Sequence, residues 1–314
     1  MENEKLYLGY DAEFLINDEI KEIVDLPIIG KKHVDDIAPI EGNDESILKY
    51  LNFSVKMSAS RKFAFYTASN IDGNMFKKAH RRGWRKDPRA KEFQWGTELY
   101  SAKKSDFDKG HMTKREDVQW GKTIGLAQKG ADSTFFYPNS VPQHKDLNQV
   151  IWKSLEDYVL HTETKTNLLK VCVFTGPVLS ESDPNFVTQV KGATVQIPIV
   201  FWKVIVYPKN DGKLYRVGFM MSQNRLLFEN GIVEEYEKGV IGEDLFMQFE
   251  DAETYQVNIS LIETLAGIKF PKAIDSYKDD RSKKLVLKEI DIDPDLESFS
   301  NVENLGFSID NLTL

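Results

Sequence analysis

The chain has 314 residues, of which 41% are hydrophobic and 11% aromatic, and it carries a formal net charge of −8. This length allows one large domain or two modest ones, and no stretch approaches the roughly 18 apolar residues that a membrane span needs. The single cysteine, Cys172, excludes an intramolecular disulfide and a cysteine metal cluster. The N-terminus has no signal-peptide pattern, so we expect a cytoplasmic protein without a membrane partner.

The negative charge is unevenly distributed along the chain. Residues 1–60 contain 13 acidic and 6 basic side chains, and residues 289–314 contain seven acidic side chains and no basic one. Between these ends, residues 77–91 hold eight Lys or Arg against one Asp. The sequence therefore predicts a concentrated basic patch between two acidic ends, and a nucleic-acid partner stays possible despite the acidic total.

In the first half of the chain, runs of aromatic and turn-forming residues indicate short elements. The expected elements are a partly ordered arm over 1–45, a strand over 61–73, a loop over 77–91 and an aromatic strand over 133–143. Residues 93–112 show no clear periodicity. His111 lies in this stretch, in a charged segment that gives little sign of helix or strand.

In the second half, apolar residues at helical spacing predict a helix over 146–160, with Asp146 as its N-cap. A second helix is predicted over 256–271, stopped by Gly267. Three further runs read as strands: 168–179, 193–207 and 213–223. Strands and helices mix without βαβ regularity, which favours an α+β fold with a largely antiparallel sheet. We expect an acidic arm (1–50), one domain (51–276) and an acidic extension (277–314).

Hydrolysis of a phosphodiester needs a base that deprotonates the attacking water, cations that offset charge on the phosphoryl oxygens, and a group that stabilises the leaving oxygen. His111, the basic residues of 77–91 and the polar start of the 146–160 helix are candidates for these parts. A neutral histidine suits the first task because its ordinary pKa, about 6.5, lies near neutral pH. On these residues alone a surface imidazole explains His111 as well as a catalytic one does.

Two motifs in the chain are more specific than a histidine behind a glycine. They are "FDKGH" (107–111) and "NSVPQHKDLNQVIWKSLED" (139–157). Together they resemble the sugar-non-specific DNA/RNA endonucleases of the ββα-metal, or His-Me finger, superfamily, of the endonuclease G type. The resemblance extends over roughly 60–272 and includes "RGWRKDP" (82–88). It implies a mixed, largely antiparallel sheet that carries a ββα-metal active-site motif.

The resemblance also implies roles for residues on both motifs. His111 matches the family's general base, and Asn148 matches the one direct protein ligand of a hydrated Mg²⁺ ion, for which Mn²⁺ is a possible substitute. Glu156 lies two helical turns after Asn148 and would orient a metal-bound water. His144 lies near the same turn and is expected at the surface.

Three further site residues follow from the same resemblance. Arg82 would contact a phosphate, and Asp108 would position the loop that carries the histidine. Lys109 stands where the family has arginine, and lysine keeps the charge but loses the bidentate fork that grips a phosphate. Lys109 therefore puts the catalytic rate in doubt more than the binding of a polyanion.

The implied function is a Mg²⁺-dependent, non-specific endonuclease that cleaves DNA and RNA and leaves 5′-phosphate ends. The alternative, motivated by Lys109, is a catalytically weakened member that binds nucleic acid. The family relation suggests a homodimer as a further expectation. The acidic ends raise the hypothesis that residues 1–60 or 289–314 occupy the basic patch, or that an inhibitor or activator protein docks on them.

Overall fold

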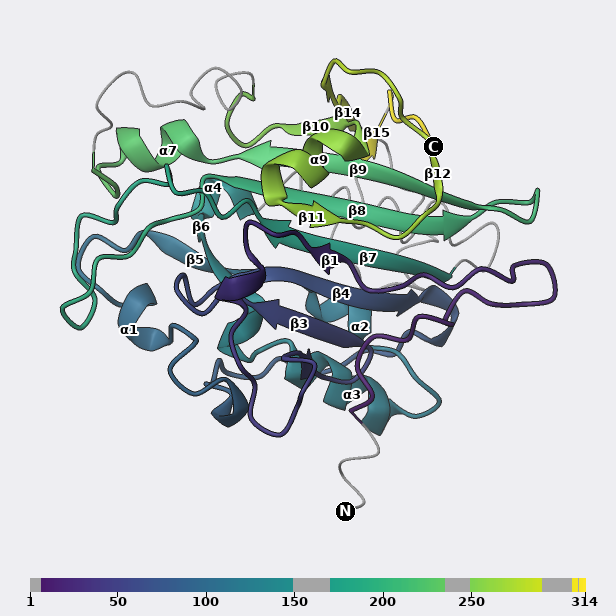
Figure 1. The fold of residues 1–314 in the computed structure, drawn as a ribbon, viewed down its shortest axis with the longest axis horizontal. Helices are drawn as coiled ribbons and strands as arrows, with labels where there is room; N and C mark the ends of the chain where they lie inside the picture. Colours follow the sequence, from purple (N-terminus) through teal and green to yellow (C-terminus); the bar gives the residue numbers. More distant parts are fainter. Residues whose placement is uncertain (1–6, 149–169, 235–248, 290–306, 310) are drawn as a thin grey trace.

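The computed structural model describes residues 7–148, 170–234, 249–289, 307–309 and 311–314, and a large sheet crosses its centre (Figure 1). The strands of this sheet are β2 (Leu48–Lys49), β3 (Phe53–Met57), β4 (Ala64–Asp72), β7 (Lys170–Pro177), β8 (Val200–Pro208), β9 (Leu214–Ser222), β10 (Thr254–Val257), β12 (Ile274–Asp275) and β13 (Lys283–Lys284). Their order is β13-β10-β9-β8-β7-β4-β3-β2, with β12 added beside β9. Only β12 pairs in parallel, so the predicted α+β class with a largely antiparallel sheet is confirmed.

Three two-stranded ribbons accompany the large sheet. They pair β1 (Ile28–Ile29) with β11 (Ile268–Lys269), β5 (Phe107–His111) with β6 (Ser140–His144), and β14 (Leu287–Glu289) with β15 (Phe307–Ile309). The described α-helices are α1 (Thr97–Tyr100), α2 (Arg115–Val118), α3 (Ile124–Ser133), α4 (Lys145–Asn148), α7 (Asn224–Glu229) and α9 (Ile259–Ala266). None of them has the length and apolar character that a membrane crossing requires.

The large sheet is buried on both faces. In register across β4, β7, β8 and β9, one row holds Ala68, Phe174, Val204 and Gly218. The absence of a side chain at Gly218 leaves room for Ile259 and Ile262 of α9. The other face carries a second apolar cluster around Val173, Ile205, Val217 and Ile309. Burial of each large apolar side chain contributes about 1.5–3 kcal/mol, so the sheet is a rigid support for the elements at its edge.

Helix α9 (Ile259–Ala266) is shorter than the helix predicted over 256–271. Residues 254–257 form strand β10, and Asn258 begins the helix because its side chain accepts a hydrogen bond from the Ser260 amide at 2.9 Å. Gly267 ends it with φ +64°, as predicted. Two strand predictions also change: 133–139 contains a 3-10 turn over Tyr137–Asn139, and β8 begins only at Val200.

Both ends of the described chain are built into the fold. Tyr10 packs against Phe174 with ring centroids 5.6 Å apart, and Asp11 and Asn70 exchange two hydrogen bonds of 2.7 and 3.0 Å. At the other end, the Gln256 side chain bonds both the backbone N–H and the carbonyl of Thr313. The extension predicted over 277–314 therefore includes β13, which pairs with β10 in the large sheet.

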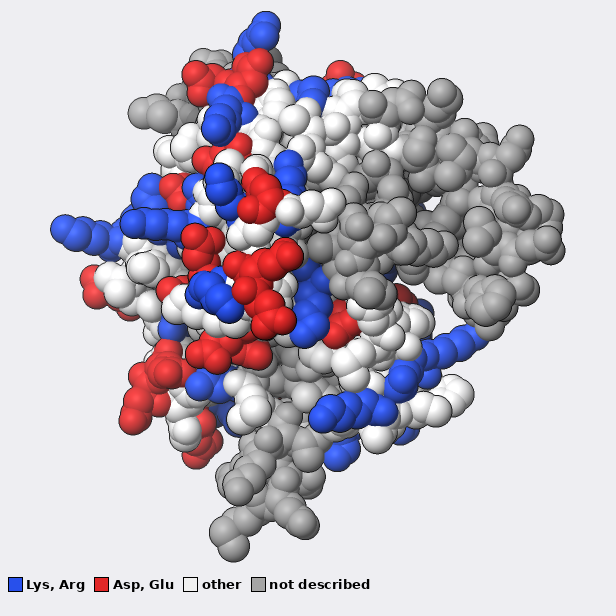
Figure 2. Space-filling view, turned by 90° about the vertical axis from the view of Figure 1, so that its right-hand side faces the viewer, with Lys and Arg blue, Asp and Glu red and all other residues white. Residues whose placement is uncertain are grey.

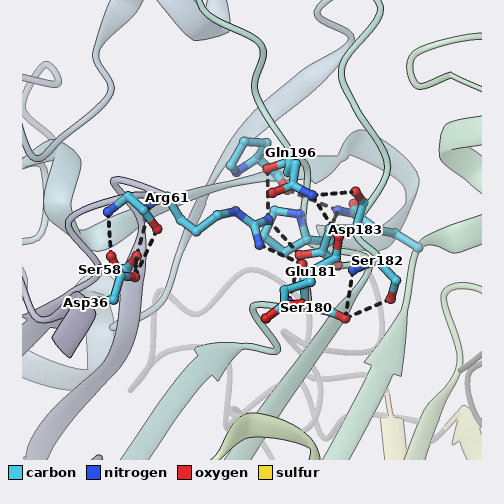
Figure 3. A network of polar contacts seen from close by, with 12 residues as sticks. Asp36, Ser58, Arg61, Ser180, Glu181, Ser182, Asp183 and Gln196 are labelled. Atoms are coloured by element: carbon cyan, nitrogen blue, oxygen red, sulfur yellow. Dashed lines mark hydrogen bonds and ion pairs between the residues drawn. The ribbon is translucent and has the colours of Figure 1, made fainter. Parts of the chain in front are cut away.

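A buried arginine joins two distant turns (Figure 3). Arg61 follows β3 and donates from Nη1 to the carbonyl of Ser180 at 2.9 Å and from Nη2 to the carbonyl of Gln196 at 3.0 Å. Nη2 also lies 2.6 Å from Oδ2 of Asp183, whose side chain is fully buried. Arg61 therefore fixes the base of the segment 180–196 against the sheet.

Candidate active site

The two sequence motifs meet in one ββα unit. Strands β5 and β6 pair antiparallel, with Asp108 opposite Gln143 and His111 opposite Ser140. Helix α4 follows β6 directly and contacts both strands. The expectation of little strand character around His111 is therefore wrong, because His111 is the last residue of β5. The predicted ββα arrangement is present.

Gly110 is required by the close approach of the two strands. A Cβ atom at this position would overlap the buried side chain of Gln143. Only glycine lets the Gln143 side chain cross β5 directly before His111. The Gly-His pair thus has a packing reason in addition to any chemical one.

Asn139 fixes the chain directly after His111. Its Oδ1 accepts a hydrogen bond from the Thr113 amide at 2.8 Å, and its Nδ2 donates to the carbonyls of Thr113 and Thr134 at 2.8 and 3.0 Å. The Met112 amide donates to the Asn139 carbonyl at 3.0 Å. The sequence marked Asn139 as part of a motif but gave it no role, since its partners lie on other segments. Asn139 thus holds the turn that follows His111 in place.

The imidazole of His111 packs with two aromatic rings, which also contact each other with centroids 5.5 Å apart. The ring centroids of Trp84 and Phe135 are 4.5 and 5.1 Å from that of His111. Its Nε2 atom is buried and has no hydrogen-bond partner within the described part of the chain. Burial lowers the pKa of His111 to about 3, and the negative charge of Glu116 opposes this only in part. The imidazole is therefore neutral over the whole neutral and weakly acidic range, which is the protonation state that a general base requires.

The basic segment 77–91 is held beside the ββα unit by α3 and the turn after it. The side chain of Gln128 accepts from the His80 amide at 2.8 Å and donates to the His80 carbonyl at 2.9 Å. The Arg85 amide donates to the Phe135 carbonyl at 2.9 Å, and the Arg85 guanidinium lies 4.0 Å from the ring centroid of Phe136. The exposed cations of the segment are thereby presented next to His111.

The other predicted site residues differ in how well the structure places them. The side chain of Arg82 is 60% exposed and lies 3.4 Å from the carboxylate of Asp132. Asp108 is half-buried on β5, and the Nζ atom of Lys109 lies 5.4 Å from the ring centroid of Tyr100. Asn148 ends α4, although its side chain is outside the described set, and Glu156 lies outside the described residues altogether.

His144 is not at the surface, contrary to the prediction. It is fully buried, and its backbone N–H donates to Oε1 of Gln223 at 2.7 Å. Gln223 also donates to the carbonyl of Pro142 at 3.1 Å. This contact attaches β6 to the end of β9, so His144 belongs to the support of the ββα unit.

The donor set is compatible with a hydrated cation. Among the described residues, no three His, Cys, Asp or Glu side chains come together in a group that could hold a metal ion. A Mg²⁺ ion that keeps most of its waters needs only one or two protein ligands. An amide oxygen at Asn148, on a helix that packs against both β5 and β6, fits that requirement.

Charge elsewhere on the surface is mixed. The side of the protein at the right of Figure 1 carries Asp and Glu clusters interleaved with Lys and Arg (Figure 2). Among the described residues of this face, charges of both signs lie side by side (Figure 2). The segment 77–91, by contrast, carries charge of mainly one sign, with eight Lys or Arg against one Asp.

Comparison with known proteins agrees with this geometry. A family model described as DNA/RNA non-specific endonuclease matches residues 36–276. Protein y4fB of Sinorhizobium fredii, which is uncharacterized, is 35% identical over 228 residues, covering 68% of this chain and 32% of that protein. Mitochondrial endonuclease G of Bos taurus is 34% identical over 124 residues, covering 37% of this chain and 38% of that protein. The chain thus spans about a third of the length of these relatives.

A solved structure has the same fold at low sequence identity. The crystal structure of the EndoG/EndoGI complex, which concerns the mechanism of EndoG inhibition, superposes with a TM-score of 0.51 and 21% identity. The match covers 73% of this chain and 86% of the other.

Proposed function

Because the chain belongs to the DNA/RNA non-specific endonuclease family, we propose that it is a metal-dependent endonuclease that hydrolyses phosphodiester bonds of DNA and RNA. The observation that carries this proposal is His111, a neutral imidazole at the end of β5 beside the exposed cations of 77–91. A neutral imidazole can take a proton from water. Cations that contact phosphates read no base identity, so cleavage would be non-specific.

In the proposed reaction, His111 accepts a proton from the water that attacks phosphorus. The bond to the 3′ oxygen breaks, and a 5′-phosphate end remains. The exposed guanidinium of Arg82 offsets charge on the phosphoryl oxygens, and Asp108 and Lys109 precede His111 on the same strand. Asn148 would hold a Mg²⁺ ion and Glu156 would support one of its waters; the ion would supply positive charge for the phosphoryl and leaving oxygens.

Replacing Asn148 with alanine should raise the Mg²⁺ concentration needed for half-maximal cleavage by at least about 10-fold, because metal affinity falls when an oxygen ligand is lost. Titration of plasmid nicking with Mg²⁺ and with Mn²⁺ measures this, and EDTA should abolish cleavage by the wild type. Asn210→Ala, at an exposed asparagine between β8 and β9, is the matched control. An unchanged titration for Asn148→Ala would remove this residue from the metal site.

Replacing Trp84 with leucine should make the activity sensitive to mild acid. Removal of the ring that lies 4.5 Å from His111 admits water, so the pKa of His111 rises from about 3 toward its ordinary value of about 6.5. A base is lost when it is protonated. The wild type should therefore keep its kcat/KM from pH 7 down to 5, whereas the variant should lose activity as the pH falls through 6.

The measurement for Trp84→Leu is kcat/KM on a short oligonucleotide between pH 4 and 8. Phe76→Leu, at an exposed aromatic just before the same segment, serves as control and should behave as the wild type. Identical acid limbs near pH 6.5 in all three proteins would show that the aromatic rings do not set the pKa of the base.

The second candidate function is a nucleic-acid-binding protein with weakened catalysis. It is favoured by Lys109, whose Nζ lies over the ring of Tyr100 and lacks the fork with which arginine grips a phosphate. Plasmid nicking with and without EDTA separates the two functions. Retention of plasmid in a gel-shift assay without any nicking in Mg²⁺ or Mn²⁺ would favour the binder.

A non-specific nuclease in the cytoplasm, the compartment we propose, needs control. An inhibitor or activator protein that docks on the acidic ends is one means, and a homodimer is a second proposed association. Residues 311–314 contact β10 and β13 through Gln256 and Lys283. These contacts give no support to the hypothesis that the C-terminal end occupies the basic patch.

A further inference from the structure

Two lysines pair with one carboxylate at the edge of the candidate active site, and two further lysines lie on a neighbouring turn. Glu98 in α1 accepts from Nζ of Lys86 at 2.6 Å and lies 3.5 Å from Nζ of Lys191. Residues 185–196 form a hairpin whose Thr188 hydroxyl donates to the carbonyl of Lys103 at 2.5 Å. This contact places Lys103 and its neighbour Lys104 beside the hairpin that carries Lys191. We call Lys86, Lys103, Lys104 and Lys191 the lysine platform.

The platform keeps a surplus of positive charge. Glu98 pairs with two of its members, Lys86 and Lys191. All four lysines are exposed. Burial would raise the pKa of Glu98, but the hydrogen bond from Lys86 and the charge of Lys191 hold it below its ordinary value. Glu98 therefore stays ionised and fixes two of the cations without neutralising the group.

Two members of the platform hold a backbone conformation that lysine rarely adopts. Lys104 has φ +68° and Lys191 has φ +52°. Glycine or asparagine would occupy the left-handed region with less strain. Both lysines therefore occupy a strained backbone conformation.

The platform continues the basic surface of the candidate active site. Lys86 belongs to the segment 77–91, four residues after Arg82, and an extended chain covers that separation in about 13 Å. On the other side, α1 contacts β5, and Tyr100 at its end lies under Nζ of Lys109, two residues before His111. A row of cations therefore runs from Arg82 past the ββα unit to the hairpin 185–196.

We propose that the lysine platform is a second phosphate-binding surface, which holds the double-stranded nucleic acid that flanks the bond to be cleaved. Separate lysines at loop tips bind phosphates as point charges. A docking protein would need apolar and aromatic anchors at the centre of its interface, and the platform residues supply none. The inference deepens the proposed function and rests on it.

The test is the triple variant Lys103→Gln, Lys104→Gln, Lys191→Gln, compared with a control triple of exposed lysines, Lys213→Gln, Lys272→Gln, Lys278→Gln. The control residues lie next to β9 and β12, at the opposite end of the sheet from α1 (Figure 1). Binding of a labelled 30-base-pair duplex is measured by fluorescence anisotropy in EDTA, at several salt concentrations. Cleavage of the same duplex and of a six-nucleotide strand is measured in Mg²⁺.

We expect the platform variant to bind the duplex at least about 10-fold more weakly at low salt, with a salt slope reduced by about 2–3. The KM for the duplex should rise while cleavage of the six-nucleotide strand stays as in the wild type. Duplex affinity and slope equal to those of the control triple would overturn the inference. If the triple variant does not fold by circular dichroism, the single variant Lys191→Glu gives the same comparison.

Two further outcomes separate the proposals. If the wild type neither binds nor cleaves nucleic acid, the proposed function fails; if it does both and the platform variant is unchanged, only the platform fails. Polyglutamate of matched charge is the probe for an acidic protein. Binding of polyglutamate as tight as that of the duplex, lost in the platform variant, would assign the surface to a protein and overturn the nucleic-acid role.

Discussion

Replacing His111 with alanine is expected to lower the rate of phosphodiester cleavage in Mg²⁺ by at least about 10²-fold, the lower end of the usual scale for a general base. The imidazole packs against Trp84 and Phe135 and is neutral. The segment 77–91 beside it contributes mainly cations, which cannot accept a proton at neutral pH. Initial rates of plasmid nicking measure the effect.

His80→Ala is the matched control for this substitution. His80 is exposed in the segment 77–91, and only its backbone groups bond to Gln128. Its loss should leave the nicking rate within about 3-fold of the wild type, as expected of a surface change remote from the chemistry. Cleavage by purified His111→Ala at the wild-type rate would show that another group activates water.

The same histidine should affect stability in acid. The pKa of His111 is about 3 in the folded chain and about 6.5 in the unfolded chain, so the unfolded state binds the extra proton between these values. Stability from this group is complete above pH 6.5 and is lost as the pH falls toward 3, by up to about 1.4 kcal/mol per pH unit. Comparing urea unfolding of wild type and His111→Ala at pH 5 and 7 isolates this contribution.

The sequence predicted the ββα unit of the site better than the surroundings of its residues, whose catalytic roles stay predictions. Among the described motif residues, 107–111 lie on β5 and 140–148 lie on β6 and α4, so the two motifs come together in the fold. Strand β5 itself was missed because Asp108, Lys109 and Gly110 have little strand preference. Their strand conformation comes from pairing with β6, which is a tertiary interaction.

Residues that act across distant segments could not be predicted from the sequence. Trp84 and Phe135 lie on separate segments, and only the fold places both against His111. His144 looked like a surface residue because its partner, Gln223, follows it by 79 positions. Hydrophobic periodicity reports which face of one element is buried, but it says nothing about which partner a polar group meets.

The pair of Arg61 and Asp183 also joins distant segments and could not be predicted from the sequence. Its loss is expected to have the second large effect, a fall in the free energy of unfolding. The side chains are 13% and 0% exposed, and their N–O distance is 2.6 Å (Figure 3). Replacing Arg61 with methionine leaves the carboxylate of Asp183 buried without its cation. Removal of one partner from a buried pair costs about 3–5 kcal/mol. The free energy of unfolding should therefore fall by this amount at pH 8.

The cost of Arg61→Met should depend on pH in a defined direction. Burial raises the pKa of Asp183 to about 6 despite the charge of Arg61, and the unfolded value is about 3.9. The folded chain thus binds the proton more tightly, so the stability from this carboxyl is complete below pH 3.9 and is lost as the pH rises through 6. Loss of Arg61 raises the folded pKa further, and the variant should be less impaired at pH 5 than at pH 8.

Urea unfolding of three proteins at pH 5 and 8 decides the matter: Arg61→Met, Asp183→Asn and the double variant. The double variant removes both charges, so at pH 8 it should be more stable than Arg61→Met alone, since no unpaired carboxylate stays buried. Equal losses for Arg61→Met at the two pH values would mean that Asp183 is not the charge Arg61 compensates. Arg61 also donates hydrogen bonds to the carbonyls of Ser180 and Gln196, so Arg61→Met should loosen the hairpin 185–196. Because this hairpin carries Lys191, duplex binding by the lysine platform should weaken. Cleavage of the six-nucleotide strand should continue.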